Sequence, residues 1–276
     1  MHAQLDGLSD NVEVILLDDG CHEFADLNKK NAKLYGVIYF KNKKNLGRIK
    51  SRMKLASSSR NTWLLFLDAD MIPVADNFIA KYCKNIAKDK HEVYVGGHCY
   101  KKNNSLLSLR QNYGNAREDV DYRLRNKNPY NHVFFGNIVI KKKLFNTIFS
   151  THLDCPYGED IYLSGMLHKL QVAVLHLNNK TFHLGIENNA TFILKIEEAA
   201  NTVAQLFRDN NIDKSQSKLV NYYHFLTHYK LTSITYFALA VIHPILKKSL
   251  LWFANPLFFV DLFRLYHFMK HFRNGN

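Results

Sequence analysis

Residues 63–70 of the chain read WLLFLDAD, five apolar residues followed by two aspartates with an alanine between them. A short, fully apolar run of this kind is typical of a strand that is buried on both faces of a parallel sheet. Ligands of open α/β sheets bind just beyond the carboxyl ends of the strands, which is where Asp68 and Asp70 fall. Two carboxylates there can share a hard cation, Mn²⁺ or Mg²⁺, that would hold a diphosphate. The alternative interpretation of this short motif is a solvated turn.

The segments around this stretch alternate between predicted strands and helices. A second apolar run at residues 12–17 ends in Asp18, Asp19 and Gly20. Further strands are expected at residues 36–40, 92–95, 133–140 and 172–177, and helices at 23–34, 48–59, 76–87 and 188–208, with one more beginning at Glu159. This alternation predicts an α/β domain with a mostly parallel sheet, which closes near residue 210. Residues 101–143 are expected to form a loop-rich basic surface, since cations outnumber acids there.

Composition limits the class of protein. The 276 residues are 47% apolar and 22% charged, with 12 Gly and 5 Pro, which excludes a disordered, collagenous or low-complexity chain and predicts one or two domains. The 37 Lys and Arg outweigh the 24 Asp and Glu, so the net charge is +13. This excess indicates an anionic partner, which could be nucleic acid, a membrane surface or a phosphorylated small molecule.

The cysteines and the first residues indicate the compartment. Cys21, Cys83, Cys99 and Cys155 are far apart and form no CxxC pair, so neither a disulfide scaffold nor a structural zinc site is expected. Residues 1–7 contain neither a basic region nor an apolar core of a signal peptide. We therefore expect a cytoplasmic protein.

Candidate nucleotide-binding residues follow the first predicted strand. Asp18 and Asp19 can accept hydrogen bonds from a nucleobase N–H or a ribose hydroxyl, although Asp-Gly is also a frequent turn pair. Arg48 and Arg52 are four residues apart, so they share one face of the predicted helix and could meet phosphate oxygens. A solvated basic face is the alternative interpretation of these arginines.

Two later segments carry candidate catalytic and metal-binding groups. Glu159 and Asp160 open a predicted helix after Gly158, where one carboxylate could take a proton from an attacking hydroxyl. Acids are also favoured at this position simply because they complement the helix dipole. His183 follows a predicted strand and could complete a metal shell, or it could be a structural histidine.

Several classes of protein are excluded by the motifs that the sequence lacks. The chain contains no HExxH, GxGxxG or GxxxxGK[ST] motif, which argues against a zinc protease, a dinucleotide dehydrogenase and a P-loop NTPase. It also contains no helix-turn-helix, zinc-finger or RNP pattern, so no nucleic-acid partner is expected.

The region 211–276 differs from the rest in composition and is predicted to be an amphipathic, aromatic-rich helical extension. Its longest apolar stretches, residues 234–242 and 250–254, fall short of the ~18–20 residues that a membrane-spanning helix needs, so no transmembrane helix is expected. Five cations lie among the aromatic residues against one acid, which is typical of a helix in a membrane interface. A helical layer packed on the main domain is the alternative interpretation. The cations are Lys247, Lys248, Arg264, Lys270 and Arg273, and the acid is Asp261.

The order of these motifs resembles the family 2 glycosyltransferases of GT-A fold over about residues 11–207. The resemblance rests on Asp18-Asp19-Gly20, Arg48 with Arg52, Asp68-Ala69-Asp70, Gly136-Asn137, Gly158-Glu159-Asp160 and His183, in that order. The stretches Leu109-Arg110-x-x-Tyr113-Gly114-x-x-Arg117-Glu118 and Tyr157-Gly158-Glu159-Asp160 look like a bacterial subgroup that builds surface polysaccharides. The resemblance implies a Rossmann-like sheet flanked by helices.

The resemblance also implies a reaction, with roles for particular residues. It implies inverting transfer of a sugar from a nucleotide-diphosphate sugar to a saccharide or lipid-linked saccharide, assisted by Mn²⁺ or Mg²⁺, at the cytoplasmic face of the cell membrane. In such an enzyme Asp18 and Asp19 would contact the base, Asp68 the ribose and Asp70 the cation. Asp160 would be the general base beside Glu159. His183 would be a further metal ligand, and Gly136 and Asn137 would lie on the acceptor side.

Two departures from the family pattern favour a competing interpretation. Family members begin with an apolar strand and a loop before the first helix, and we expect this chain to lack that strand, since only eleven residues precede its first apolar run. Cys21 stands where the family commonly has serine. The competing hypothesis is therefore a truncated, catalytically inactive module that binds a membrane surface or a nucleotide without turnover.

Overall fold

The structure is a computed structural model that describes residues 4–5, 12–101, 108–150, 157–252 and 257–274. Cys155, and most of the residues before the first predicted strand, lie outside the described residues. The described strands are β1 (Ile15–Asp18), β2 (Ile38–Lys41), β3 (Trp63–Leu67), β4 (Met71–Pro73), β5 (Val93–Val95), β6 (His98–Cys99), β7 (Asn137–Lys141), β8 (Val174–His176) and β9 (Thr181–His183).

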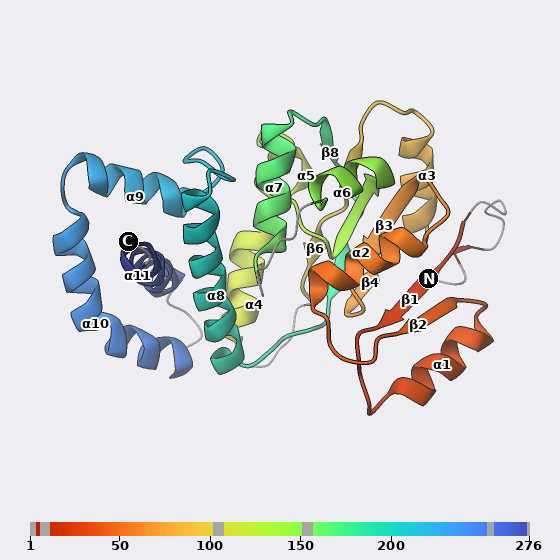
Figure 1. Cartoon of the computed structure of the whole chain (residues 1–276), viewed down its shortest axis with the longest axis horizontal. Helices are drawn as coiled ribbons and strands as arrows, with labels where there is room; N and C mark the ends of the chain where they lie inside the picture. Colours follow the sequence, from red (N-terminus) through yellow and green to blue (C-terminus); the bar gives the residue numbers. More distant parts are fainter. Residues whose placement is uncertain (1–3, 6–11, 102–107, 151–156, 253–256, 275–276) are drawn as a thin grey trace.

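Helices follow most of the strands, as the sequence predicts (Figure 1). They are α1 (Ala25–Leu34), α2 (Arg48–Ser58), α3 (Phe78–Ile86), α4 (Leu109–Tyr113), the π-helix η2 (Gly114–Glu118), α5 (Tyr122–Arg125), α6 (Lys142–Ile148), α7 (Glu159–Lys169), α8 (Asn189–Arg208), α9 (Lys218–His228), α10 (Thr232–Trp252) and α11 (Leu257–Asn274). The α/β class with a C-terminal helical part is therefore confirmed.

The strands of the described residues form three small sheets rather than one mostly parallel sheet. Their orders are β1-β2, β3-β7-β5-β8 and β4-β9-β6. The pairs β1-β2, β5-β8 and β6-β9 are parallel, whereas β3-β7, β5-β7 and β4-β9 are antiparallel. The prediction of a mostly parallel sheet was wrong in this respect, because β7 lies antiparallel between β3 and β5.

Strand β3 has the predicted bounds, and both of its faces are covered. Leu64 and Phe66 are buried in a core that α2, α6 and α7 share. Trp63, Leu65 and Leu67 pack on the opposite side, against buried residues of α3. Burial on two faces explains why this strand has no polar residue, since each side chain faces a helix rather than water.

The antiparallel pairing of β3 with β7 places two predicted segments side by side. Leu67 is opposite Asn137, and Trp63 is opposite Lys141. The backbone N–H of Asp68 donates to the carbonyl oxygen of Gly136 at 3.3 Å. The end of β3 that carries Asp68 is thus the end at which β7 begins.

Residues 101–143 are more ordered and less exposed than the sequence predicts. In its described part, this region contains α4, η2, α5 and β7. Arg110 and Arg125 are buried, so the prediction of a basic surface was wrong for these two residues. The guanidinium of Arg125 donates to the carbonyl oxygens of Gly96 and Leu177, each at 3.0 Å. Its charge is used inside the fold, where it satisfies backbone acceptors.

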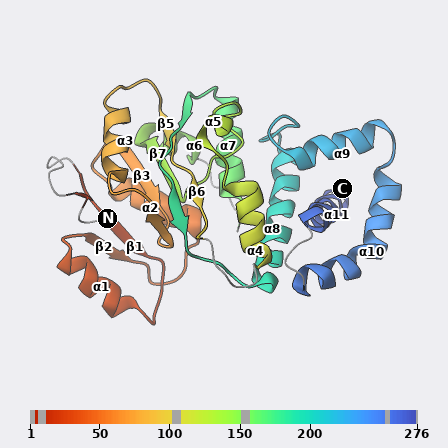
Figure 2. The same cartoon turned by 180° about the vertical axis from the view of Figure 1, so that it is seen from behind.

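The C-terminal helices form a lobe beside the sheets. Helix α11 runs through the middle of this lobe, with α8, α9 and α10 around it (Figures 1 and 2). Leu239 of α10 and Phe268 of α11 are buried in the same core as β3. The lobe is therefore packed on the main domain through α8, as one of the two interpretations of its sequence expects.

Helix α10 corrects the expectation about membrane-spanning length. Residues 234–242 and 250–252 belong to one continuous helix of 21 residues, which includes Pro244, whereas residues 253–254 lie outside the described residues. By length and composition alone, this helix could cross a membrane. Leu239, Leu246 and Leu250 are its buried residues, so one side packs on the lobe, while the opposite side carries exposed apolar residues.

Candidate functional site

Arg52 joins three segments that are far apart in the sequence. Its buried guanidinium donates from Nη2 to Oδ1 of Asp68 at 2.8 Å and from Nη1 to Oε1 of Glu159 at 2.9 Å. The guanidinium also lies over the ring of Phe135, 4.5 Å from its centroid. The helix α2, the loop after β3 and the start of α7 therefore meet at one arginine, and the contact of Arg52 with phosphate oxygens stays a prediction.

Arg48, one turn earlier on α2, lies at the exposed side of the same cluster. Its Nη1 is 3.5 Å from Oε1 of Glu159, and its guanidinium carbon is 4.9 Å from the centroid of the Tyr157 ring. The side chain is 47% exposed, whereas that of Arg52 is 9% exposed. Arg48 can thus reach an incoming phosphate, while Arg52 holds the acids in place.

The two acids at the start of α7 differ in their protonation. Gly158 precedes them with a φ of +112°, a left-handed conformation that favours glycine. Desolvation of Glu159 would raise its pKa, but Arg52 and Arg48 lower that pKa below its ordinary value. Desolvation, followed by repulsion from Glu159, raises the pKa of Asp160 to about 7. The Oδ1 atom of Asp160 accepts a hydrogen bond from the backbone N–H of Phe135 at 2.7 Å.

Asp70 and His183 meet because β4 pairs with β9. Met71 is opposite His183 in this antiparallel pair, and Nε2 of His183 lies 3.2 Å from Oδ2 of Asp70. The hydrogen bond from His183 lowers the pKa of Asp70. A Cβ atom at Gly185 would lie 2.2 Å from Oδ2 of Asp70, so only glycine leaves room for this carboxylate. The carboxylate and the imidazole thus form a pair at the same end of the sheets as Asp68.

The sequence profile of Glycosyl transferase family 2 matches residues 2–149, which is more than half of the chain. The chain belongs to glycosyltransferase family 2. No curated protein matches it.

Solved structures of similar fold are distant in sequence. The mannosyltransferase PcManGT of Pyrobaculum calidifontis, in complex with GDP-Man and Mn²⁺, is 12% identical, with a TM-score of 0.57 over 99% of this chain and 80% of that chain. Glucosyl-3-phosphoglycerate synthase of Mycobacterium tuberculosis, in complex with phosphoglyceric acid, is 16% identical, with a TM-score of 0.51 over 76% of this chain and 74% of that chain. TarS of S. aureus is 12% identical, with a TM-score of 0.48 over 72% of this chain but only 35% of that chain. The family match and the similarity to PcManGT show that this glycosyltransferase has the GT-A fold.

The pair of Asp70 and His183 is compatible with a divalent cation. Carboxylate oxygen and imidazole nitrogen are both ligands that Mn²⁺ accepts. Among the described residues no group of three or more His, Cys, Asp or Glu could hold a metal ion, so an ion here would need further ligands from the substrate or from water. Asp68 differs from Asp70 in that its Oδ1 is bound to Arg52.

A buried network behind His183 was missed by the sequence reasoning. Nη2 of Arg110 is 3.4 Å from Nδ1 of His183, and Nη1 donates to Oε2 of Glu118 at 3.0 Å. His98 lies 3.1 Å from the same carboxylate oxygen, and the hydroxyl of Tyr100 also donates to it. Desolvation would raise the pKa of Glu118, but His98 and Arg110 lower it to about 2. The motif around Arg110 and Glu118 was visible in the sequence, but its charges were assigned to the surface.

Asp18 and Asp19 lie at the carboxyl end of β1, where their carboxylates organise loops. Asp18 accepts from the backbone N–H of Cys21 at 2.8 Å and from Asn28 at 3.2 Å. Asp19 accepts from the backbone N–H groups of Leu46 and Gly47 at 2.9 and 3.0 Å, directly before α2. Desolvation opposes ionisation of both acids, but these hydrogen bonds lower both pKa values. Asp19 thereby fixes the start of the helix that carries the two arginines, and contact with a base stays a prediction.

Asn137, at the start of β7, has its side chain inside the fold. It is fully buried, and its Nδ2 donates to the carbonyl oxygens of Gly97 and Asn179, each at 2.8 Å. Its Oδ1 accepts from the hydroxyl of Tyr82 at 2.6 Å. These hydrogen bonds hold the Asn137 side chain within the fold, and its place on the acceptor side stays a prediction. Gly136, by contrast, lies beside Asp68 at the candidate site.

Proposed function

We propose that this family 2 glycosyltransferase moves a sugar, with inversion, from a nucleotide-diphosphate sugar to a saccharide or lipid-linked saccharide acceptor in bacterial surface-polysaccharide synthesis. The observation that carries the proposal is the double ion pair of Arg52 with Asp68 and Glu159. It brings Asp68 of the DxD motif and Glu159 at the start of α7 into one site, although they are about ninety positions apart in the chain.

Asp160 is the general base of the proposed reaction. A base works best when its pKa lies near the operating pH, and the pKa of Asp160 is about 7. The N–H of Phe135 fixes one carboxylate oxygen, which leaves the other to accept the proton of the attacking hydroxyl. Glu159 stays ionised between Arg52 and Arg48, and its charge raises the pKa of Asp160, which makes the ionised Asp160 a stronger base.

The donor is bound on the side of the two arginines and of Asp70. Arg48 is exposed and can meet the diphosphate oxygens, while Asp68 and the acids of β1 face the nucleoside. Asp70 and His183 would hold Mn²⁺ or Mg²⁺, and such an ion would supply positive charge to stabilise the leaving diphosphate. The Mn²⁺ and GDP-Man in the structure of PcManGT support this assignment.

The test is sugar transfer by the wild-type chain and two variants. Asp160→Asn and Asp70→Ala are expected to abolish transfer, and the product of the wild type is expected to have the opposite anomeric configuration to the donor by NMR. Asp209→Asn, on an exposed residue at the end of α8, is the matched control and keeps the wild-type rate. Transfer at wild-type rates in both site variants would exclude the proposed roles, and a product with retained configuration would exclude the inverting mechanism.

We also propose that the enzyme works in the cytoplasm, attached to the inner face of the cell membrane through α10. Five large apolar side chains on one side of α10 are exposed by 59–77%. From Lys218 onwards, seven Lys or Arg accompany one acid, Asp261, and that acid is paired with Arg117 at 2.9 Å. Anionic lipid headgroups would complement this charge, and the apolar face would enter the interface. The five residues, the α10 face, are Ile234, Phe237, Val241, Ile245 and Trp252.

Co-sedimentation with phosphatidylglycerol vesicles tests this attachment. The wild type is expected to bind at low salt and to bind less as the salt concentration rises. Val241→Glu with Ile245→Glu is expected to abolish binding, whereas Leu194→Glu, on an exposed apolar residue of α8, leaves it unchanged. If the double variant of α10 binds the vesicles as well as Leu194→Glu does, the α10 face is excluded as the membrane-binding surface.

The second candidate function is a catalytically silent module that binds the membrane surface through the same α10 face. It predicts vesicle binding without any transfer, even with metal present. The transfer assay and the vesicle assay therefore separate the two candidates.

A further inference from the structure

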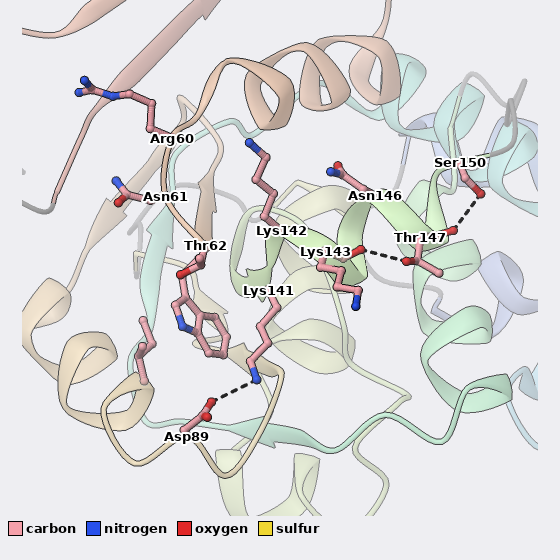
Figure 3. A pocket seen from close by; sticks show the side chains of 12 residues that line it. Arg60, Asn61, Thr62, Asp89, Lys141, Lys142, Lys143, Asn146, Thr147 and Ser150 are labelled. Carbon is pink, nitrogen blue, oxygen red and sulfur yellow. Dashed lines mark hydrogen bonds and ion pairs between the residues drawn. The ribbon is translucent and has the colours of Figure 1, made fainter.

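A pocket of about 1040 Å³ opens at the N-terminal end of β3 (Figure 3). Trp63 and Lys141, which are paired in the sheet, both line it. Asp68 follows the other end of β3, and five residues of strand at about 3.3 Å each separate the two ends by roughly 16 Å. The pocket is therefore distinct from the candidate transfer site.

The pocket is strongly basic. Four cations and one acid line it: Arg60, Lys141, Lys142 and Lys143 with Asp89. The Nζ atom of Lys141 is 3.1 Å from Oδ1 of Asp89. The Nζ atom of Lys142 donates to the backbone carbonyl oxygen of Ser59 at 2.5 Å. Lys143 is exposed, and no acid among the described residues forms an ion pair with it or with Lys142. The pocket thus holds positive charge that an anionic ligand can neutralise.

The remaining lining is suited to the hydroxyl groups and the C–H face of a sugar. The hydroxyls of Thr147 and Ser150 donate to backbone carbonyls at 3.0 Å each, so their oxygens remain acceptors for ligand hydroxyls (Figure 3). Asn61 and Asn146 add amide donors and acceptors. Trp63 supplies an aromatic surface, with Nζ of Lys141 5.4 Å from its ring centroid.

We propose that this pocket binds an acid-bearing saccharide, a polyhydroxylated ring that carries a phosphate or carboxylate group. Lys142 and Lys143 bind the acid, since Arg60 is already paired with Glu13 at 3.5 Å. The neutral side chains bind the hydroxyls, and Trp63 packs against the ring. A nucleic-acid strand fits less well, because such strands need a groove along the backbone with successive stacking aromatics, and Trp63 is the one aromatic residue among the described residues that line the pocket. This site is independent of the proposed transfer reaction.

Tryptophan fluorescence gives a direct test, because the chain has only two tryptophans, Trp63 and Trp252. In a Trp252→Phe background, titration with glucose 6-phosphate is expected to change the Trp63 signal saturably. Glucose and inorganic phosphate, tested separately, are each expected to bind at least about tenfold more weakly. Lys143→Glu is expected to weaken glucose 6-phosphate binding at least about tenfold, because it replaces a charge-assisted contact with repulsion. Lys127→Glu, an equal charge change on an exposed residue outside the pocket, has no effect.

Several results would overturn the proposal. One is the absence of any saturable fluorescence change with glucose 6-phosphate. Another is a Lys143→Glu variant that binds glucose 6-phosphate as tightly as the unsubstituted background; circular dichroism would verify that this variant is folded. Inorganic phosphate that binds as tightly as glucose 6-phosphate would indicate a plain anion site. A single-stranded oligonucleotide that binds more tightly than the sugar phosphate would indicate a nucleic-acid surface.

Discussion

Replacing Arg52 with alanine is expected to destabilise the chain strongly at neutral pH and much less at acidic pH. The side chains of Arg52 and Glu159 are 9% and 3% exposed, so removal of the arginine leaves a buried carboxylate without its main partner. Breaking a buried ion pair from one side costs about 3–5 kcal/mol. Asp68 is 43% exposed, so the loss of its contact adds little beyond this. At roughly 2–4 °C per kcal/mol for a chain of this size, the melting temperature falls by at least about 6 °C.

The pH dependence distinguishes an electrostatic cause from a simple loss of packing. In the wild type, the pKa of Glu159 lies below its ordinary value of 4.5, so the pair stabilises the fold above that pH and loses its effect as the pH falls through the lowered pKa. Without Arg52, the pKa of Glu159 rises, because desolvation still opposes ionisation and Arg48, 3.5 Å away, lowers the pKa without the help of Arg52. A protonated Glu159 carries no unpaired charge, so the difference between variant and wild type shrinks as the pH approaches 4.5.

Urea unfolding of both chains at neutral pH and near pH 4.5 is the assay. Arg48→Ala is the matched control, and it is expected to cost about 1 kcal/mol or less, since this arginine is half-exposed. The reasoning would be refuted if Arg52→Ala lowered the free energy of unfolding by no more than Arg48→Ala does. It would also be refuted if the loss caused by Arg52→Ala were the same at both pH values.

Three further predictions follow from the same site. Because the pKa of Asp160 is about 7 and the base must be ionised, kcat/KM is expected to rise with pH up to about 7 and then level off; a pH–rate profile that stays flat through pH 7 would contradict this. Gly185→Ala is expected to displace the Asp70 carboxylate and to weaken Mn²⁺-dependent nucleotide binding at least about tenfold while the chain stays folded; calorimetric titration measures this, and unchanged affinity would contradict it. Glu118→Gln is expected to lower the free energy of unfolding by about 1.5–3 kcal/mol, because Arg110 loses its charged partner, and urea unfolding measures this loss; a change within error of zero would exclude the network as a stabilising element.

The sequence predicts the strands and helices well where local pattern decides them. Trp63–Leu67 is an observed strand with the predicted bounds, and the helix predicted from Arg48 begins at that residue. Asp68 and Glu159 meet through Arg52 because each lies at the end or start of an element at one edge of the sheets. This is the part of the site that a spacing argument can reach.

The remaining features depend on contacts that local patterns do not contain. The direction of β7 is not encoded in Asn137–Lys141, because an apolar run reads the same for parallel and antiparallel pairing. Arg110 is buried because Glu118, His98 and Tyr100 surround its charge, and composition alone places such a residue on the surface. Proline usually ends a helix, whereas α10 continues through Pro244, and no local pattern predicts this.

Nucleotide binding tests the central claim most directly. Thermal unfolding of the chain is measured with UDP, GDP, CDP and dTDP, each with and without Mn²⁺, for the wild type and for Asp70→Ala. A nucleotide at one hundred times its dissociation constant adds ~2.7 kcal/mol of stability. We expect one nucleotide to raise the melting temperature by several degrees only when Mn²⁺ is present, and we expect Asp70→Ala to lose this shift. A chain that unfolds cooperatively but shows no shift with any nucleotide would contradict a donor site at Arg52, Asp68 and Asp70.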